Sequence, residues 1–442
     1  MADKYIALPK GVSEKLFDAA IKEFRSVLGE AAVLTSAAQL APYIKTMMPV
    51  PDSEHVPSAA LMATTVEQIQ KIVGICNQYK VPLWPISTGK NLGYGSAAPA
   101  ERGQVVLDLK RMNRILEVNK DLAYALVEPG VTYQQLYDHI AEHKLGLWLS
   151  VPAPSAIAGP TGNTLDRGVG YTPYGEHFLF ACGMEVVLAN GEVLRTGMGS
   201  LPNSNTWQVF KWGYGPYLDG IFTQSNYGIV TKFGFWLMPA PPVYKPFVIQ
   251  YQDEGDIVEI VETIRPLRIS GVIPNAAVIA HALYDAPTKA KRSDYYTGPG
   301  AIPDAAVRKI SKDHDLGIWN IYAALYAGRR ELEDRDAGVR QIRQGQDPDR
   351  EGDGGRPGFR LSGRNHAWRH EPGGVFLVQL ARRRGFHVVC AGLAGPRQRD
   401  AQADVADQAD TWQARTGLFR RIHRRHAGYA PYRRCPVRQD QP

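Results

Sequence analysis

The 442-residue sequence lacks the patterns that several common protein classes need. Its four cysteines include no Cys-x-x-Cys pair, so no c-type haem is attached to this chain. No apolar run approaches the roughly 20 residues of a membrane span, and the first residues contain no apolar core of a signal peptide. These absences predict a protein without a membrane segment, cytoplasmic by default, although a partner could carry it into the periplasm. No metal site is expected, because the one candidate cluster has the spacing of a solvated helix face: Asp138, His139, Glu142 and His143.

Both standard nucleotide-binding fingerprints are also missing. The sequence contains neither Gly-x-Gly-x-x-Gly opening a helix nor a loop that ends in Gly-Lys-Ser/Thr. Instead, an apolar run leads into residues 85–96, which read Pro-Ile-Ser-Thr-Gly-Lys-Asn-Leu-Gly-Tyr-Gly-Ser. Glycines allow such a turn to present successive backbone N–H groups to an anion. The stretch therefore predicts a cradle for the diphosphate of a cofactor, with a plain structural turn as the alternative.

Two further segments share this character. Residues 155–177 contain glycines too densely spaced for regular structure, with almost no room for a helix. A loop of this length inside a compact domain is usually functional. Residues 224–239 place Gly228 directly before an apolar strand. Together the three segments predict one extended cofactor that is held mostly by backbone.

Helical and strand patterns alternate around these loops, which indicates an α/β or α+β fold. Capping residues and apolar periodicity predict a helix at 13–29, a helix that begins at Thr65 and runs through Cys76, and a helix at 132–143, with strands at 81–86, 105–109 and 124–127. A proline-rich joint at 239–242 precedes a strand at 247–251, a helix from Ile257 and an apolar stretch at 272–283. This second strand and helix unit predicts the start of another domain.

Four phrases identify a family. They are Thr-Gly-Lys-Asn-Leu-Gly-Tyr-Gly-Ser (88–96), Val-Glu-Pro-Gly-Val-Thr (127–132), Asp-Arg-Gly-Val-Gly-Tyr-Thr-Pro-Tyr-Gly-Glu-His (166–177) and Gly-Met-Glu-Val-Val-Leu-Ala-Asn-Gly (183–191). From about residue 8 to about residue 327, the sequence closely resembles the p-cresol methylhydroxylase branch of the vanillyl-alcohol oxidase family. The resemblance implies an α+β protein with α/β subdomains. Its expected parts are an N-terminal helical segment (1–54), an FAD-binding domain (55–242), a partial cap or substrate domain (243–328) and a tail (329–442).

The resemblance also implies which residues bind FAD and substrate. Tyr94 matches a tyrosine that binds the substrate phenolate and is the expected catalytic residue. The expected FAD-binding residues come from all three segments and the turn at 129–130: Ser87, Thr88, Gly89, Lys90, Asn91, Leu92, Gly93, Gly95, Ser96, Pro129, Gly130, Ser155, Gly159, Gly162, Asn163, Arg167, Gly168, Gly170, Tyr171, Gly228, Ile229 and Val230.

The implied reaction is oxidation and hydroxylation of a 4-alkylphenol of the 4-cresol, 4-ethylphenol or eugenol type. A free phenol has a pKa of about 10, so the site must stabilise the phenolate. The benzylic carbon then gives hydride to the flavin, and water adds to the resulting quinone methide. The resemblance to the p-cresol methylhydroxylase branch also implies a homodimer of flavoprotein subunits that passes electrons to a cytochrome c subunit. Oxidase relatives, which use O2, carry an acid in the stretch that matches 150–155; this sequence has none there, which favours the dehydrogenase.

The basic residues are unevenly distributed along the chain. Residues 329–442 contain 23 arginines, no lysine and 14 acidic residues, whereas the first 328 residues contain 28 basic and 30 acidic residues. The tail therefore carries +9 and the rest −2, and no nucleic-acid partner is expected for the rest. A basic tail that binds nucleic acid is one interpretation of this composition.

A shifted reading frame is the interpretation that we favour for the tail. Starting each codon of 374–391 one nucleotide later permits Glu-Phe-Ser-Leu-Tyr-Asn-Trp-Arg-Gly-Gly-Gly-Gly-Phe-Met-Trp-Phe-Ala, which is similar to the family around its FAD-linked tyrosine. The codon of that tyrosine straddles those read as Val378 and Gln379. A further tyrosine and an arginine of the family's phenolate site also have no match here. The tail is therefore expected to be unstructured, and FAD, covalent in the family, is expected to be non-covalent at most.

Overall fold

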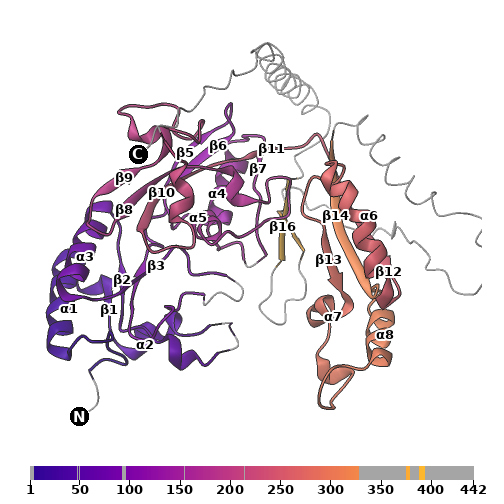
Figure 1. Ribbon diagram of the computed structural model, residues 1–442, viewed down its shortest axis with the longest axis horizontal. Helices are drawn as coiled ribbons and strands as arrows, with labels where there is room; N and C mark the ends of the chain where they lie inside the picture. Colours follow the sequence, from indigo (N-terminus) through magenta and orange to yellow (C-terminus); the bar gives the residue numbers. More distant parts are fainter. Residues whose placement is uncertain are drawn as a thin grey trace, which may run out of the picture. The chain divides into compact units, whose positions relative to one another are not determined.

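The architecture is that of a computed structural model, shown in Figure 1. The structure describes residues 4–46, 48, 50–91, 96–153, 155–213 and 215–327, together with the backbone of two short strands further along the chain. All of these residues belong to one compact unit. Helices and both parallel and antiparallel strands are present among them, so the expected α+β class is confirmed.

The first sheet has the strand order β1-β2-β4-β3. Its strands are β1 (Val33–Leu34), β2 (Ala59–Met62), β3 (Leu83–Ile86) and β4 (Val105–Asp108). Both β2 and β3 run parallel to β4, whereas β1 is antiparallel to β2. Since parallel strands end at the same edge of a sheet, the loops that follow β3 and β4 leave the sheet next to each other.

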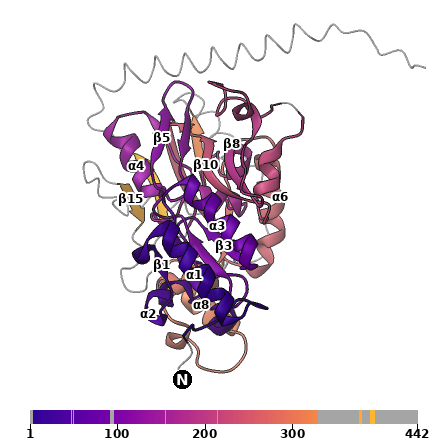
Figure 2. The same cartoon turned by 90° about the vertical axis from the view of Figure 1, so that its left-hand side faces the viewer.

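Two amphipathic helices, α1 (Glu14–Leu28) and α3 (Val66–Tyr79), lie beside each other against this sheet (Figure 2). Their buried faces join the strands in one apolar core. The Thr65 side chain caps α3 by accepting a hydrogen bond from the Gln68 N–H. Thr65 and Gln68 have the spacing of a capping box, but the Gln68 side chain accepts from the N–H of Thr64 instead of Thr65, so only one of the two bonds of that box forms.

The second sheet is antiparallel throughout, with the order β5-β6-β10-β8-β9. Its strands are β5 (Ile115–Asn119), β6 (Tyr124–Val127), β8 (Ala181–Leu188), β9 (Val193–Arg195) and β10 (Gly228–Trp236). Helix α4 (Tyr133–Glu142) packs on it, and β7 (Leu147–Trp148) pairs with β11 (Met238–Pro239). The middle strand, β10, comes last in sequence, so β6 and β8 become part of one sheet only after β10 has paired with both.

The second glycine-rich segment contains a helix, contrary to the expectation of almost no helical structure there. Helix α5 covers Pro160–Leu165, with Gly159 as its N-cap residue and Pro160 in its first turn. Proline is favourable at that position because the missing N–H would have no partner inside the helix. Because glycines are so dense in this segment, the sequence did not predict that a helix begins at Pro160.

A third sheet follows the proline-rich joint, in orange tones in Figure 1. Its order is β12-β14-β13, formed by β12 (Val243–Tyr251), β13 (Val278–His281) and β14 (Trp319–Ala327). Helix α6 (Ile257–Ile269) buries Ile260 and Ile264 in its core, and α7 (Ala282–Asp285) and α8 (Asp304–Asp313) follow. This is the region in which a cap domain was expected.

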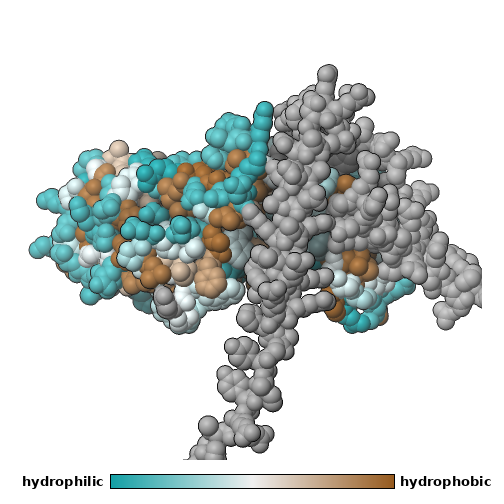
Figure 3. Space-filling model, turned by 90° about the horizontal axis from the view of Figure 1, so that it is seen from above, coloured by the Kyte–Doolittle hydropathy of each residue, from teal (hydrophilic) through white to brown (hydrophobic). Residues whose placement is uncertain are grey.

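The tail is described only at β15 (Val375–Val378) and β16 (Val388–Leu393), which pair antiparallel. These two strands depart from the expectation of an unstructured tail. The rest of 329–442 lies outside the described residues. No helix among the described residues is long and apolar enough to cross a membrane. On the face shown in Figure 3, apolar side chains are interspersed with polar ones.

Candidate active site

Three chain segments meet beside the ends of β3 and β4. A Cβ atom placed on Gly162 would lie 2.1 Å from Oγ of Ser87, in the first loop. One placed on Gly159 would lie 3.0 Å from Cγ2 of Thr88 and 3.5 Å from the carbonyl oxygen of Pro129. The first loop, the turn at 129–131 and the start of α5 are therefore in van der Waals contact, as expected for parts of one cofactor site.

Two glycines of this site have no room for a side chain. A Cβ on Gly130 would approach the carbonyl oxygens of Leu109 and Lys110 to 2.6 Å each. Gly89 has a φ of +64°, and its Cβ would lie 2.8 Å from Cβ of Ala97. Both contacts involve backbone or Cβ atoms that cannot rotate away. The backbone can therefore curve here to face a ligand only because these residues are glycine.

The far end of the first loop closes on itself. The N–H of Ser96 donates to Oδ1 of Asn91 at 3.1 Å, and Nδ2 of Asn91 donates to the Ser96 carbonyl at 3.5 Å. Lys90 is exposed. Four expected site residues between these anchors lie outside the described residues: Leu92, Gly93, Tyr94 and Gly95. The expected catalytic role of Tyr94 thus remains a prediction.

Asn163 and His177 connect α5 to the end of the second glycine segment. His177 Nδ1 shares a short hydrogen bond with Oδ1 of Asn163, and a Cβ on Gly168 would lie 2.3 Å from Nδ2 of the same asparagine. A Cβ on Gly170 would lie 2.3 Å from Oγ of Ser150 and 2.5 Å from Nε2 of His177. Gly168 and Gly170 are therefore packing positions, fixed by the side chains around them.

His177 is only 7 % exposed, and this burial lowers the pKa of the imidazole to about 4. The nearby Ser150 backbone opposes the shift only in part. Among the described residues, neither Nε2 of His177 nor Oγ of Ser150 has a hydrogen-bond partner of good geometry. The imidazole is therefore neutral at pH 7. The role of His177 was missed from the sequence, although it ends the quoted phrase Gly-Glu-His.

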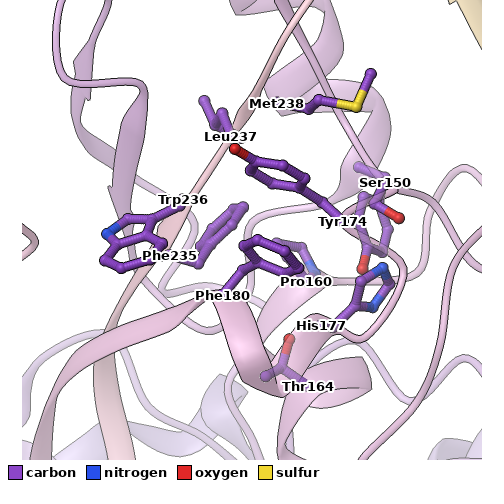
Figure 4. Close-up of a pocket in the computed structure, with 11 residues that line it drawn as sticks. Ser150, Pro160, Thr164, Tyr174, His177, Phe180, Phe235, Trp236, Leu237 and Met238 are labelled. Atoms are coloured by element: carbon purple, nitrogen blue, oxygen red, sulfur yellow. The ribbon is translucent and has the colours of Figure 1, made fainter. Parts of the chain in front are cut away.

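A small cavity adjoins these two side chains (Figure 4). Aromatic rings form much of its wall, and Tyr174 stacks on Phe180 with ring centroids 3.9 Å apart. Its lining residues are Tyr133, Ser150, Pro160, Thr164, Tyr174, His177, Phe180, Phe235, Trp236, Leu237 and Met238. The volume of about 20 Å³ accommodates about one water-sized molecule, so this cavity does not hold a flavin.

Arg167 is occupied by protein contacts rather than turned to an anion. Its backbone is left-handed, with φ +55°, its Nε donates to Oγ1 of Thr223 at 2.9 Å, and its guanidinium lies 4.0 Å from the centre of the Phe178 ring. The adjacent Asp166 carbonyl accepts from Nε2 of Gln224 at 3.1 Å. These bonds bring the third glycine segment against the second. The structure thus favours a structural role for the Arg167 side chain over the expected contact with FAD.

The third segment contributes backbone to the site. Gly228 is the first residue of β10, and its Cβ would lie 2.4 Å from Cγ1 of Val186. Ile229 and Val230 are buried and pair with β8. No described strand pairs with these three residues on the opposite side, because the pairing with β6 begins at Phe233. The expected contact of these residues with FAD stays a prediction, and it falls on their backbone groups on that side.

The remaining two expected residues, Ser155 and Tyr171, make hydrogen bonds within the protein. Oγ of Ser155 accepts from the N–H of Ile157 at 3.2 Å. The carbonyl of Tyr171 accepts hydrogen bonds from two residues of the third sheet region, Asn275 and Tyr326. Asn275 was not expected at the site, because nothing in its sequence context indicates the contact. In the described part of the chain, no group of three or more His, Cys, Asp or Glu side chains is arranged to hold a metal ion.

We expect Gly130→Ala to destabilise the fold and weaken FAD binding, because the added methyl group would overlap two carbonyl oxygens. Overpacking of this kind typically costs about 1–3 kcal/mol. Urea unfolding and fluorescence titration with FAD measure the two effects. Gly74→Ala is the matched control: it lies in α3, where an added Cβ meets nothing within 4 Å. There the exchange should stabilise by about 0.5–1 kcal/mol. Equal results for both variants would contradict the assigned packing.

Comparison with known proteins gives consistent matches. Residues 57–197 match the family described as FAD binding domain. The flavoprotein subunit of 4-cresol dehydrogenase [hydroxylating] from Pseudomonas putida is 60 % identical over 327 residues, which are 74 % of this chain and 63 % of the relative. The crystal structure of p-cresol methylhydroxylase with substrate bound matches with a TM-score of 0.75 and 58 % identity, covering 76 % of this chain and 66 % of that one.

A third similar protein is an oxidase. The 4-ethylphenol oxidase from Gulosibacter chungangensis, in complex with isoeugenol, matches with a TM-score of 0.73 and 40 % identity, covering 76 % of this chain and 64 % of that chain. The chain thus spans slightly less than two thirds of each of these three relatives.

Proposed function

Since this chain belongs to the vanillyl-alcohol oxidase family of flavoproteins, we propose that it binds FAD and that its active form oxidises a 4-alkylphenol. The observation that carries the proposal is the convergence of Gly89, Gly130, Gly159 and Gly162, where side chains are excluded by close contacts. A surface of this kind fits an extended, flat cofactor with a diphosphate.

The residues present fit FAD in chemistry as well as in space. Backbone N–H groups of 87–91, 159 and 161–162 would hold the diphosphate and ribityl oxygens without a buried cation. The turn at 129–130 offers no donor, because Pro129 has no N–H and Gly130 donates its own to the carbonyl of Met112 at 2.7 Å. The open side of β10 at 228–230 would meet another part of the cofactor. FAD, when bound, supplies the acceptor for a hydride. The chain's own part is then to orient the cofactor and the donor, and to exclude water.

The substrate proposal rests on phenol chemistry. Because a phenol ionises only near pH 10, a donor that favours the phenolate is needed at neutral pH. Tyr94 can supply one hydroxyl donor from the first loop. The names of the relatives, 4-cresol dehydrogenase and 4-ethylphenol oxidase, support a 4-alkylphenol as the first candidate.

Tyr94→Phe tests this role. In a form of the protein that turns over 4-ethylphenol, the loss of a hydrogen bond to the phenolate should lower kcat/KM by about 1–3 kcal/mol of transition-state stabilisation. FAD affinity should change little. Tyr79→Phe is the control. The Tyr79 hydroxyl, on α3, donates to Glu23 on α1, and both residues lie outside the expected site. An unchanged kcat/KM for Tyr94→Phe would remove Tyr94 from the reaction.

We propose a dehydrogenase that passes electrons to a cytochrome subunit, since the closely similar Pseudomonas protein is a flavoprotein subunit. The absence of an acid from 150–155 supports this choice. The second candidate is an oxidase, which the match to 4-ethylphenol oxidase favours. Steady-state oxidation of 4-ethylphenol with cytochrome c or with O2 as acceptor decides between them. Flavin that is not bleached by any 4-alkylphenol under anaerobic conditions would contradict both.

A further inference from the structure

We propose that Asn275 positions the segment 168–177 from the cap, because its side chain joins the carbonyl of Tyr171 to the central strand of the cap sheet. The inference rests on the proposed function only in taking this segment, the flavin loop, to lie beside FAD. Its structural content stands on four hydrogen bonds of one buried asparagine.

The Asn275 side chain uses both ends of its amide. Nδ2 donates to the carbonyl of Tyr171 at 3.2 Å and to the carbonyl of Ala276 at 3.1 Å. Oδ1 accepts from the N–H of Ala324 at 3.3 Å. With an exposure of 4 %, Asn275 has little access to water, so these bonds are not readily replaced by solvent.

On the cap side, the N–H of Ala324 depends on the Asn275 side chain for its hydrogen bond. Ala324 lies in β14, opposite Pro246 of β12, and beyond Tyr322, where the pairing with β13 stops. Its N–H is therefore outside the β13 ladder in a residue that is only 3 % exposed. An unpaired buried N–H is unfavourable, which explains why an asparagine oxygen occupies the place of a strand partner.

The partner on the flavin side is held from two directions. Gly170, next to Tyr171, is wedged between Oγ of Ser150 and Nε2 of His177. The Tyr171 carbonyl itself receives Nδ2 of Asn275 and, at 3.5 Å, the hydroxyl of Tyr326. The segment 168–177 is thus fixed by the FAD domain on one side and by the cap on the other.

The backbone of Asn275 is itself anchored. Nη1 of Arg268, near the end of α6, donates to the carbonyl of Asn275 at 2.5 Å and to the carbonyl of Ile273 at 2.8 Å. The amide is therefore presented from a defined turn rather than a free loop. It connects α6, β14 and the flavin loop.

The test compares two substitutions by hydrogen exchange of the full chain with FAD added. Asn275→Asp keeps an acceptor for Ala324 but loses the donor to Tyr171. Asn275→Ala loses both. We expect backbone exchange in 168–177 to become about five- to tenfold faster in both variants, as for the loss of about one hydrogen bond. Exchange in 319–327 should increase only in Asn275→Ala.

Tyr322→Phe serves as the control, because Tyr322 lies on β14 like Ala324, and its hydroxyl donates to Asp285 in α7 and not to the flavin loop. If Asn275 only stabilises the cap, Asn275→Asp will leave 168–177 unchanged, and the proposal fails. If Asn275→Asp does not fold, the comparison of Asn275→Ala with Tyr322→Phe decides: faster loop exchange in both, or in neither, overturns the proposal. Exchange is measured without substrate, so this outcome is independent of whether any 4-alkylphenol is oxidised.

Discussion

Deleting one nucleotide within codons 328–330 is expected to give a chain that binds FAD covalently and oxidises 4-alkylphenols. The deletion restores the reading frame in which the tail resembles the vanillyl-alcohol oxidase family. It recovers the tyrosine hidden across Val378 and Gln379, which in the family is bonded to the flavin. After acid precipitation, flavin should remain in the pellet of the repaired protein, whereas the present chain should release all its flavin to the supernatant.

Removal of a complete codon at the same place is the matched control, because it shortens the chain without changing the downstream frame. Its flavin should stay in the supernatant. An early stop codon in the repaired gene would show that the tail is not a shifted reading. Covalent flavin without oxidation of any 4-alkylphenol would support the shifted-frame interpretation but contradict the proposed substrate. Salt-dependent binding of DNA by the unrepaired chain, without flavin, would support the basic-tail alternative.

Lowering the pH from 6.5 to 4 is expected to destabilise the fold through His177. Its pKa is about 4 in the folded protein, below its ordinary value of 6.5, because burial disfavours the imidazolium. Above pH 6.5 the ring is neutral in both states and contributes nothing. Between pH 6.5 and 4 only the unfolded chain takes up the proton, so stability falls by about 3 kcal/mol and then levels off.

The measurement is the free energy of unfolding of the parent and of His177→Gln at a series of pH values. Glutamine keeps an amide donor for Asn163 and does not titrate. The difference between the two proteins should therefore change through this window, although carboxyl groups with raised pKa values, such as Asp219, titrate in both. A difference that is independent of pH would mean that His177 is accessible to protons in the folded state.

Much of the site was predictable because its chemistry is local. Gly89 follows a strand whose apolar residues are consecutive in sequence. A glycine directly after such a strand indicates a turn in which the backbone adopts a positive φ. The start of α5 was equally local, but the surrounding glycines of 155–177 masked the favourable Pro160. For Arg167 a contact with FAD was expected from the resemblance, whereas its contacts with Thr223 and Phe178 could not be predicted, because folding and not sequence spacing places these partners.

Asn275 marks the limit of what periodicity reveals. Its function depends on Ala324 and Tyr171, which lie far away on either side in the sequence. A buried polar side chain of this kind belongs to no periodic pattern and to no sequence motif that would predict its contacts. His177 is intermediate: a family phrase contains it, yet its low pKa arises from burial alone and so from tertiary structure.

The position of β10 has a consequence for how the protein acquires its cofactor. This strand forms the centre of the second sheet, yet it pairs with β6, whose residues are synthesised long before it. Contacts between such distant segments form slowly, because a long loop must first be closed. The backbone of 228–230, which we propose meets the cofactor, is not in place until β10 has paired with β8. Flavin capture should therefore follow, and be limited in rate by, this late insertion, so that excess FAD does not accelerate maturation of the newly made chain.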